Sequence, residues 1–566
     1  MPSASLHDPT DRFLRFDEMV TWLDHARSAH PNLVSIESYG TSHEGRDLIV
    51  VTMTDTATGP AAQKPAHWVD ANIHSVEVTG GVAALHLIYH LITEYGSDPA
   101  VTELLSTRTV YVAPRVNPDG VEAALSPSPR HHRSSTRPWP WADGHRWPGL
   151  HPCDIDGDGR IRTMRIADAH GAWIEHPEDA RVMIPVPADG VCSPGAARYR
   201  LLTEGDIVDY DGFTIPTPRD PSGLDLNRNF PAGWSTSVTG SGDHPLSEPE
   251  IDALVRAIRA RPNVCGYNAF HTFGGVLLRP SSTRPDSDLP SSDVAVWRDL
   301  GRRGAELTGY PTHSVYEDFT PDRTDLMSGA ADDWAYDHLG VFSWTTEFWD
   351  VIHHATGERA PTTIWWDGPT PDQELAVARW CDTHIPEGYA PWQPFDHPVL
   401  GAIEIGGPDM FAVWHNPPQA MLAAEVDGHA RFAVHHALTS PRLAIVQASA
   451  HPLDEEGQVW EVTLGVANTG WLPTDISVHA RRHHLVQPVI TDIAGDGITV
   501  IDGPSRRRHG QLEGRRTTIG ALRNDGTPDR VLSRWTLRAA PLTQLTLTAT
   551  HERAGTATTT LQLTAS

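Results

Sequence analysis

Lysine is nearly absent from this sequence, and positive charge as a whole is scarce. The 566 residues include a single lysine, Lys64, and the formal net charge is −28 at pH 7. Proteins that bind nucleic acid phosphates need clustered Lys and Arg, so the charge balance excludes nucleic acid as an expected partner. We interpret the acidic surplus as carboxylates spread over a large surface, where they favour solubility.

Cysteines and long apolar runs are also scarce. The four cysteines lie far apart without any CxxC spacing, which argues against a disulfide framework and against a cysteine zinc site. No apolar run reaches the roughly 20 residues of a membrane-spanning helix, so no membrane partner is expected. The N-terminal residues MPSASLHDPTDRF lack the apolar core of a signal peptide, and we therefore expect a cytoplasmic location by default.

Helix and strand patterns alternate through the first two thirds of the chain. Residues 16–33, 80–96 and 248–262 carry apolar residues at helical spacing, and strand-like runs such as RDLIVVTMT and TVYVA lie between the first and the last of them. This alternation predicts an α/β fold with a mixed, mainly parallel central sheet flanked by helices.

The pattern changes twice along the chain and so predicts three parts. Residues 1–120 and 224–395 form the α/β domain, and residues 121–223, rich in Pro, Trp, Gly and Asp, form a lobe inserted into it. After a connecting segment at 396–436, short alternating runs such as RLAIVQASA and LTQLTLTATH occupy residues 437–566. Such runs are typical of a β-sandwich, which we interpret as an accessory domain.

One pair of residues has the spacing of a catalytic metal site. His74 and Glu77 in NIHSVEVTGG lie where an apolar strand ends and a helix begins. Zinc accepts imidazole nitrogen and carboxylate oxygen, and two His with one Glu leave a fourth position for water. His271 ends the strand-like run CGYNAFHTF, so it is the candidate third ligand at the same sheet edge. With 32 histidines in the chain, spacing alone does not decide this choice.

Further motifs occur in a fixed order around HSVE. They are SYGTSHEGRDLIV at 38–50, RVNPDG at 115–120, LDLNRNF at 224–230 and SWTTEFWD at 343–350. Their order resembles that of the carboxypeptidase A type of zinc carboxypeptidases, and the resemblance spans about residues 12–390. It implies one Zn²⁺ ion held by His74, Glu77 and His271.

The resemblance also implies roles for three other residues. The family's catalytic glutamate falls on Glu347, and the residues that hold a substrate's terminal carboxylate fall on Asn227 and Arg228. Such an enzyme removes the C-terminal amino acid of a peptide or protein by zinc-activated water, with the glutamate as general base and acid. An Arg fork and an Asn amide suit a carboxylate chemically, and the alternative for this pair is a structural turn.

The sequence departs from the family at the lip of the site. Digestive members carry a tyrosine nine residues before the tryptophan that corresponds to Trp334, and here that position is Asp325. The tyrosine is either missing or supplied by Tyr316 or Tyr336. Val76 also replaces the arginine within the family's HxxE motif.

A third departure is the long gap between His74 and His271, which the insertion at 121–223 accounts for. The insertion displaces the family's carbonyl-polarising arginine. Arg162 and Arg165 in DGDGRIRTMRIAD are the candidates for this role, and the alternative is that both are exposed loop arginines.

The inserted segment contains a calcium-like pattern. Asp154, Asp156 and Asp158 alternate with Gly at the turn, as at the start of an EF-hand loop, and calcium prefers such oxygen donors. The twelfth position is Arg165, where that loop needs a bidentate Glu. A Ca²⁺ site and an Asp/Gly turn without metal therefore both remain open.

The pocket for the substrate side chain is indicated by ADDWAYDHLG. In the family, the residue two before the tryptophan lies in this pocket, and here it is Asp332. A carboxylate at that place favours C-terminal Lys or Arg. Local hydrogen bonds that fix Asp332 or Asp333 are the alternative.

Two rival functions share the scaffold. One is a zinc amidase or deacylase, including a hydrolase of peptidoglycan-like peptides, and the other is an inactive binding homologue. Asn227 and Arg228 favour a substrate with a free carboxylate over the first rival. The complete set of metal ligands, together with Glu347, argues against the second.

Overall fold

Buried apolar strands build the central sheet of the computed structural model. The eight strands lie in the order β1-β2-β4-β3-β11-β14-β12-β13. Adjacent strands among β4, β3, β11 and β14 run parallel, whereas β1 and β2 are antiparallel, as are β12 and β14. The strands are Val34–Thr41 (β1), Asp47–Met53 (β2), Ala66–Ala71 (β3), Thr109–Ala113 (β4), Val264–Thr272 (β11), Val276–Arg279 (β12), Thr312–Ser314 (β13) and Phe342–Phe348 (β14). The mixed, mainly parallel sheet confirms the predicted fold class.

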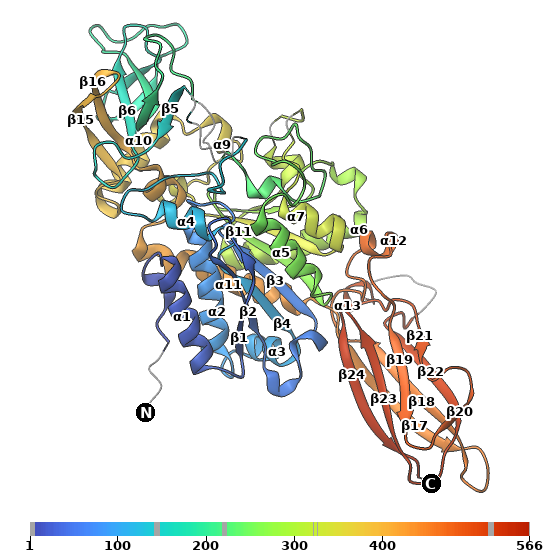
Figure 1. Cartoon of the computed structure of the whole chain (residues 1–566). Helices are drawn as coiled ribbons and strands as arrows, with labels where there is room; N and C mark the ends of the chain where they lie inside the picture. The colour runs from blue at the N-terminus through green and yellow to red at the C-terminus, as the bar shows by residue number, and fades with distance from the viewer. Residues whose placement is uncertain are drawn as a thin grey trace.

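The structure describes most of the chain. The described residues are 6–140, 146, 148–217, 223–320, 322–324, 326–518 and 526–564. Figure 1 shows a central α/β domain, with the inserted lobe at one end and a β domain at the other. Within these residues, no helix has both the length and the apolar character needed to cross a membrane.

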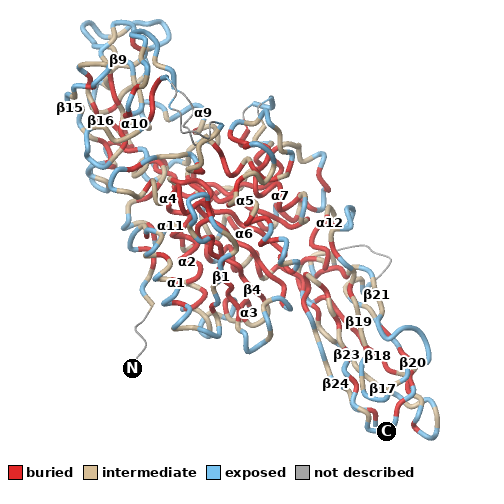
Figure 2. Tube along the Cα trace, viewed as in Figure 1, coloured by how far each residue is buried: buried red, intermediate tan, exposed pale blue. Residues whose placement is uncertain are grey.

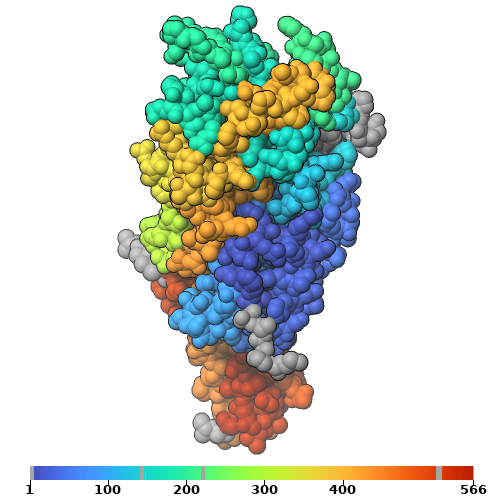
Figure 3. All heavy atoms as spheres, turned by 90° about the vertical axis from the view of Figure 1, so that its left-hand side faces the viewer, coloured from blue at the N-terminus to red at the C-terminus, as the bar shows by residue number. Residues whose placement is uncertain are grey.

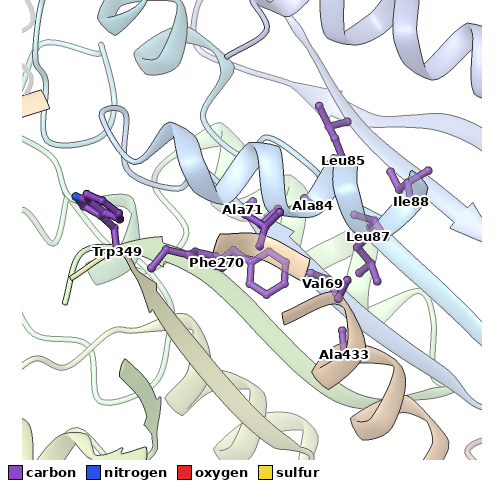
Figure 4. Close-up of a cluster of buried hydrophobic side chains, with 14 of the residues drawn as sticks. Val69, Ala71, Ala84, Leu85, Leu87, Ile88, Phe270, Trp349 and Ala433 are labelled. Carbon is purple, nitrogen blue, oxygen red and sulfur yellow. The ribbon is translucent and has the colours of Figure 1, made fainter. Parts of the chain in front are cut away.

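Helices cover both faces of the central sheet because alternate strand residues point to opposite faces. Val69 of β3 and Phe270 of β11 pack with Leu87 on one face (Figure 4). Trp68 and Tyr267 belong to the apolar cluster on the other face. The first cluster involves α1, α2, α3 and α11, and the second involves α5 and α7. The helices of this domain are Phe16–Ala29 (α1), Val78–Glu94 (α2), Pro99–Thr107 (α3), Pro118–Ala124 (α4), Pro249–Arg259 (α5), Ser291–Thr308 (α6), Ala331–Trp334 (α7), Val351–Thr356 (α8), Ile364–Asp367 (α9), Pro371–His384 (α10) and Gln419–Leu438 (α11).

The inserted lobe is built from two distant parts of the chain. Its six-stranded sheet has the order β15-β16-β6-β9-β7-β8, and β16 pairs directly with β6. The strands are Thr163–Ala167 (β6), Trp173–His176 (β7), Asp179–Pro185 (β8), Tyr199–Thr203 (β9), Tyr389–His397 (β15) and Gly401–Pro408 (β16), and a separate pair joins Gly149–Pro152 (β5) to Gly205–Val208 (β10). Residues 389–408, which the sequence suggested as the end of the α/β domain and a connection, therefore share a sheet with the insertion. In Figure 3 the orange spheres of this segment lie against the green spheres of the insertion.

The C-terminal part is a β-sandwich, as the alternating runs predicted. Two four-stranded antiparallel sheets, β17-β18-β22-β20 and β21-β19-β23-β24, enclose one apolar core that includes Trp460 and Trp535. The elements are Leu443–Pro452 (β17), Val459–Asn468 (β18), Val478–Arg482 (α12), Ile490–Gly495 (β19), Thr499–Asp502 (β20), Arg507–Arg508 (β21), Arg515–Thr518 (α13), Arg530–Arg538 (β22), Gln544–His551 (β23) and Gly555–Gln562 (β24).

The sandwich is joined to the central domain by buried polar contacts. The Asp293 carboxylate of α6 accepts hydrogen bonds from the backbone N–H groups of Val478 (2.9 Å) and His479 (3.0 Å) and from the Tyr336 hydroxyl (2.9 Å). Asp293 is buried. Figure 2 shows buried residues concentrated in the central domain, whereas the inserted lobe is mostly half-buried or exposed.

Candidate metal and catalytic site

His74, Glu77 and His271 converge at the edge of the sheet where β3 and β11 end. His74 Nδ1 lies 2.8 Å from Glu77 Oε1, and His271 Nδ1 lies 3.0 Å from Glu77 Oε2. The two Nδ1 atoms are 3.2 Å apart. Two nitrogens bound to one tetrahedral zinc ion at its usual bond length would be about 3.3 Å apart. All three side chains are buried, so the donor set fits one Zn²⁺ ion.

Close backbone approach fixes the position of Glu77. The residue directly precedes α2, and Asn72 Nδ2 donates a 2.5 Å hydrogen bond to its carbonyl oxygen. Two glycines then let the first turn of α2 dock on the sheet. A β-carbon at Gly80 would lie 2.6 Å from the Phe270 carbonyl oxygen, and one at Gly81 would lie 2.1 Å from Asn72 Oδ1. The helix start is therefore held against β11, beside the third ligand.

A second layer of charges surrounds the ligands. Asp225 Oδ1 lies 3.0 Å from His74 Nε2, which leaves Nδ1 of that ring for the metal. Arg133 donates from Nε to Asp225 Oδ2 (3.2 Å) and from Nη1 to Glu77 Oε1 (3.3 Å). Burial alone would raise the pKa of Glu77, but His74 and His271 hold it well below its usual range. The carboxylate is thus ionised and available as a ligand.

Glu347 stands on β14, directly beside His271 in the parallel register of β11 and β14. Its Oε2 is buried and has no hydrogen-bond partner among the described residues. Burial, followed by the negative charge of Glu77, raises the pKa of Glu347 well above its usual range. The position therefore offers a carboxyl group that can hold a proton next to the metal site.

These groups open onto one cavity of about 280 Å³. The polar and charged residues that line it include His74, Glu77, Arg133, Asn227, Arg228, His271, Asp332, Glu347 and His415. The structure thus brings together the expected metal ligands, Glu347 and the three residues expected to bind substrate. Arg133 and His415 were not expected there.

Asn227 and Arg228 occupy a tight turn on the cavity wall. Asn227 Oδ1 accepts the backbone N–H of Ala331 (2.9 Å), and Arg228 Nη1 donates to the Asn227 carbonyl oxygen (2.7 Å). Ala331 begins α7, and the first turn of this helix carries Asp332. Burial raises the pKa of this carboxyl group, and Oδ1 accepts the N–H of Asp333 (3.0 Å).

The structure does not bring Arg162 and Arg165 to the cavity. Arg162 donates to Asp158 Oδ2 (3.1 Å), and Arg165 donates to Glu404 Oε2 (2.7 Å), so both are bound within the lobe. Arg133 is the cavity-lining arginine that the sequence analysis missed. It follows the NPDG motif closely, and it was missed because the whole segment after Gly120 was assigned to the insertion.

Part of the cavity wall is aromatic. Asp325 lies outside the described residues, and neither Tyr316 nor Tyr336 lines the cavity in the described part of the chain. Phe273, Phe319, Trp365 and Trp366 line it instead, with ring centroids 5.7 Å apart for Phe273–Trp365 and 5.1 Å for Phe319–Trp366. Both tryptophans belong to α9, which Figure 1 shows between the central domain and the lobe.

The calcium-like cluster is built from local turns. Asp154, Asp156 and Asp158 offer carboxylate oxygens within 4.8 Å of one another, and the last two are exposed. Asp154 accepts the N–H groups of Gly157 (2.7 Å) and Gly159 (2.9 Å), and Asp156 accepts that of Asp158 (3.0 Å). Each of the three carboxylates therefore accepts a hydrogen bond from the protein, Asp158 from Arg162, so the cluster does not need an ion to be explained.

Comparisons with known proteins match both halves of the chain. The family model described as zinc carboxypeptidase matches residues 19–147 and 204–356, and a model described as a domain of unknown function matches residues 442–562. Carboxypeptidase A2 of Rattus norvegicus is 36% identical over 342 residues, which cover 60% of this chain and 63% of that protein. Carboxypeptidase A5 of Macaca fascicularis is 23% identical over 345 residues, 59% of each chain.

A solved structure, the carboxypeptidase A from Helicoverpa armigera, has 18% identity and a TM-score of 0.40, and covers 68% of this chain and 78% of its own. The chain spans less than two thirds of the length of the curated relatives named above. The matched segments contain His74, Glu77, Arg133, His271 and Glu347. On this evidence the chain belongs to the zinc carboxypeptidase family.

Proposed function

We propose that the protein is a zinc metallocarboxypeptidase that hydrolyses the C-terminal peptide bond of peptides or proteins. The observation that carries the proposal is the convergence of His74, Glu77 and His271 with Glu347 and Arg228 on one cavity. The two histidines and Glu77 would hold the metal. Glu347 would transfer protons, and Arg228 would select a free chain end.

The metal ion and Glu347 have different roles in the proposed reaction. When bound, Zn²⁺ lowers the pKa of its water and polarises the scissile carbonyl group. Glu347 would accept a proton at its carboxylate and would then donate it to the leaving amine. Its unpartnered Oε2 supports this role, because no protein group competes for the oxygen among the described residues.

Arg133 takes the place that the sequence analysis gave to Arg162 or Arg165. Its guanidinium group lies within 3.3 Å of the Glu77 carboxylate, so it borders the metal site. A fixed positive charge at this place stabilises the negative charge that develops on the scissile carbonyl oxygen. Asp225 contacts both Arg133 and His74 and so fixes the positions of these two side chains relative to each other.

The other end of the cavity binds the C-terminal residue of the substrate. Asn227 and Arg228 hold its carboxylate. Asp332 lies on the same wall, where its carboxyl group would pair with a C-terminal Arg or Lys side chain. Among the charges that act on the pKa of Asp332 is Arg228, whose guanidinium group would be paired with the substrate carboxylate.

Hydrolysis of a peptide and of its C-terminally amidated form tests the proposal. We expect release of the last residue from the free peptide, far slower turnover of the amide, and loss of activity when a chelator removes the metal. Glu347→Gln should retain zinc and lose roughly 10²–10⁴-fold in kcat. Equal turnover of both peptides would indicate an amidase or deacylase instead, and undiminished activity of metal-free protein would exclude the mechanism.

A further inference from the structure

A segment beyond the matched family region reaches the metal site. Residues Met410–His415 form a short helical turn after β16 of the inserted lobe, and Asn416 follows it. Asn416 is fully buried and accepts the Thr79 N–H (3.0 Å), while its Nδ2 donates to the Val76 carbonyl oxygen (2.8 Å). The segment is therefore fixed to the loop that carries Glu77.

This anchor places the imidazole of His415 in the cavity wall. Its ring stands edge-on to Phe273, with centroids 5.2 Å apart and an interplanar angle of 89°. It does not belong to the group of side chains whose ligand atoms lie within 4.8 Å of one another at the metal site. The proposed mechanism gives this histidine no role.

The surroundings of the ring determine which nitrogen carries its proton. Nδ1 is buried without a hydrogen-bond partner in the described part of the chain, whereas Nε2 is not among the buried, unpartnered atoms. A buried N–H without an acceptor costs more than a buried acceptor nitrogen, so the proton belongs on Nε2. Burial lowers the pKa of His415 to about 4, and the ring is neutral near pH 7. The cavity wall thus presents one neutral N–H donor.

The position of the His415 N–H in the cavity indicates which part of a substrate it would contact. The charged groups that act on His415 include Glu77, Arg133 and His74, the metal side of the cavity. In the proposed function, Arg228 and Asp332 bind the C-terminal residue, and the scissile bond lies at the metal site. Beyond the scissile carbonyl, the next hydrogen-bond acceptor along a peptide backbone is the carbonyl oxygen of the preceding residue.

We propose that His415 binds this carbonyl oxygen through Nε2–H and so positions the acyl side of the substrate. The inference rests on the proposed carboxypeptidase function and adds to it a preference for substrates with an amide on the acyl side. His415 acts as a positioning residue that the lobe and its following turn deliver to the site.

Two substrates of equal chain length test the role. Acetylglycyl and pentanoyl groups have the same chain length, but only the first carries the upstream amide, and both are joined to the C-terminal residue that the wild-type enzyme cleaves fastest. His415→Phe keeps a ring against Phe273 and removes the donor. We expect kcat/KM to fall roughly 3- to 10-fold for the acetylglycyl substrate and to stay unchanged for the pentanoyl substrate.

His415→Gln provides the rescue, because its side-chain amide can place an N–H near the position of Nε2. We expect this variant to recover most of the lost kcat/KM, with one zinc per chain in both variants. An equal loss on both substrates, or no loss on either, would overturn the role of His415 alone. A wild-type enzyme that cleaves neither substrate would overturn the carboxypeptidase assignment together with the inference that rests on it.

Discussion

Asp332 and Asp333 are adjacent carboxylates with different surroundings. Asp332 lines the cavity, whereas Asp333 accepts the backbone N–H of Ser282 (3.0 Å) and supports the fold. We predict that Asp332→Asn lowers kcat/KM for a peptide ending in Arg by roughly 10- to 100-fold relative to one ending in Leu, because a charge-assisted hydrogen bond is lost. Asp333→Asn is the matched control, and its Arg-to-Leu ratio should stay near that of the wild type. An unchanged ratio in Asp332→Asn would assign the pocket to other side chains.

Single residues differ in how far the sequence predicts them. His74, Glu77, His271 and Glu347 could be predicted because their motifs keep a fixed order, and the structure brings all four together. Arg133 could have been found only by recognising that the α/β domain continues past Gly120. Nothing in the sequence marks His415, because its place depends on how β16 pairs with β6 in the folded lobe.

At the scale of elements, the start of α2 depends on one distant side chain. Asn416 satisfies backbone groups on both sides of Glu77, at Val76 and Thr79. Asn416→Ala leaves these groups unpaired and frees the loop that holds a metal ligand. We predict about 10- to 100-fold weaker zinc affinity, measured by competition with a chromophoric chelator.

Asn468 offers a matched control for this change. It is also buried, and it bonds to the N–H of Arg442 (3.0 Å) and the carbonyl oxygen of Leu472 (2.9 Å) in the sandwich. Asn468→Ala should lower stability and leave zinc affinity unchanged. If both variants weakened zinc binding equally, the effect would reflect general destabilisation.

The helices and strands of the central domain follow from local pattern, whereas the lobe does not. The buried runs of β3, β4 and β11 and the amphipathic helix α5 are visible in the sequence as apolar strands and helical spacing. The partnership of β6 with β16 is a long-range pairing of residues 163–167 with 401–408. Periodicity identifies a strand but not its partner, so the composition of this sheet was beyond prediction.

On the scale of the whole molecule, the cavity and the sandwich lie at different ends of the central domain. Figure 1 shows α9, whose tryptophans line the cavity, on the side of the lobe, and the sandwich on the opposite side. Changes at the junction with the sandwich should therefore affect stability and leave catalysis intact.

The junction depends on Asp293, because its buried carboxylate accepts three hydrogen bonds that link α6 to α12 and Tyr336. Asp293→Ala leaves these donors without an acceptor, and we predict a loss of about 3 kcal/mol in unfolding free energy. Calorimetry should show the sandwich unfolding in a separate, earlier transition, while kcat/KM at 25 °C stays unchanged. Asp299 accepts from Arg516 (3.0 Å) at the same junction with 35% of its side chain exposed, so Asp299→Ala should cost under about 1 kcal/mol. Equal losses in the two variants would show that burial does not set the strength of the junction.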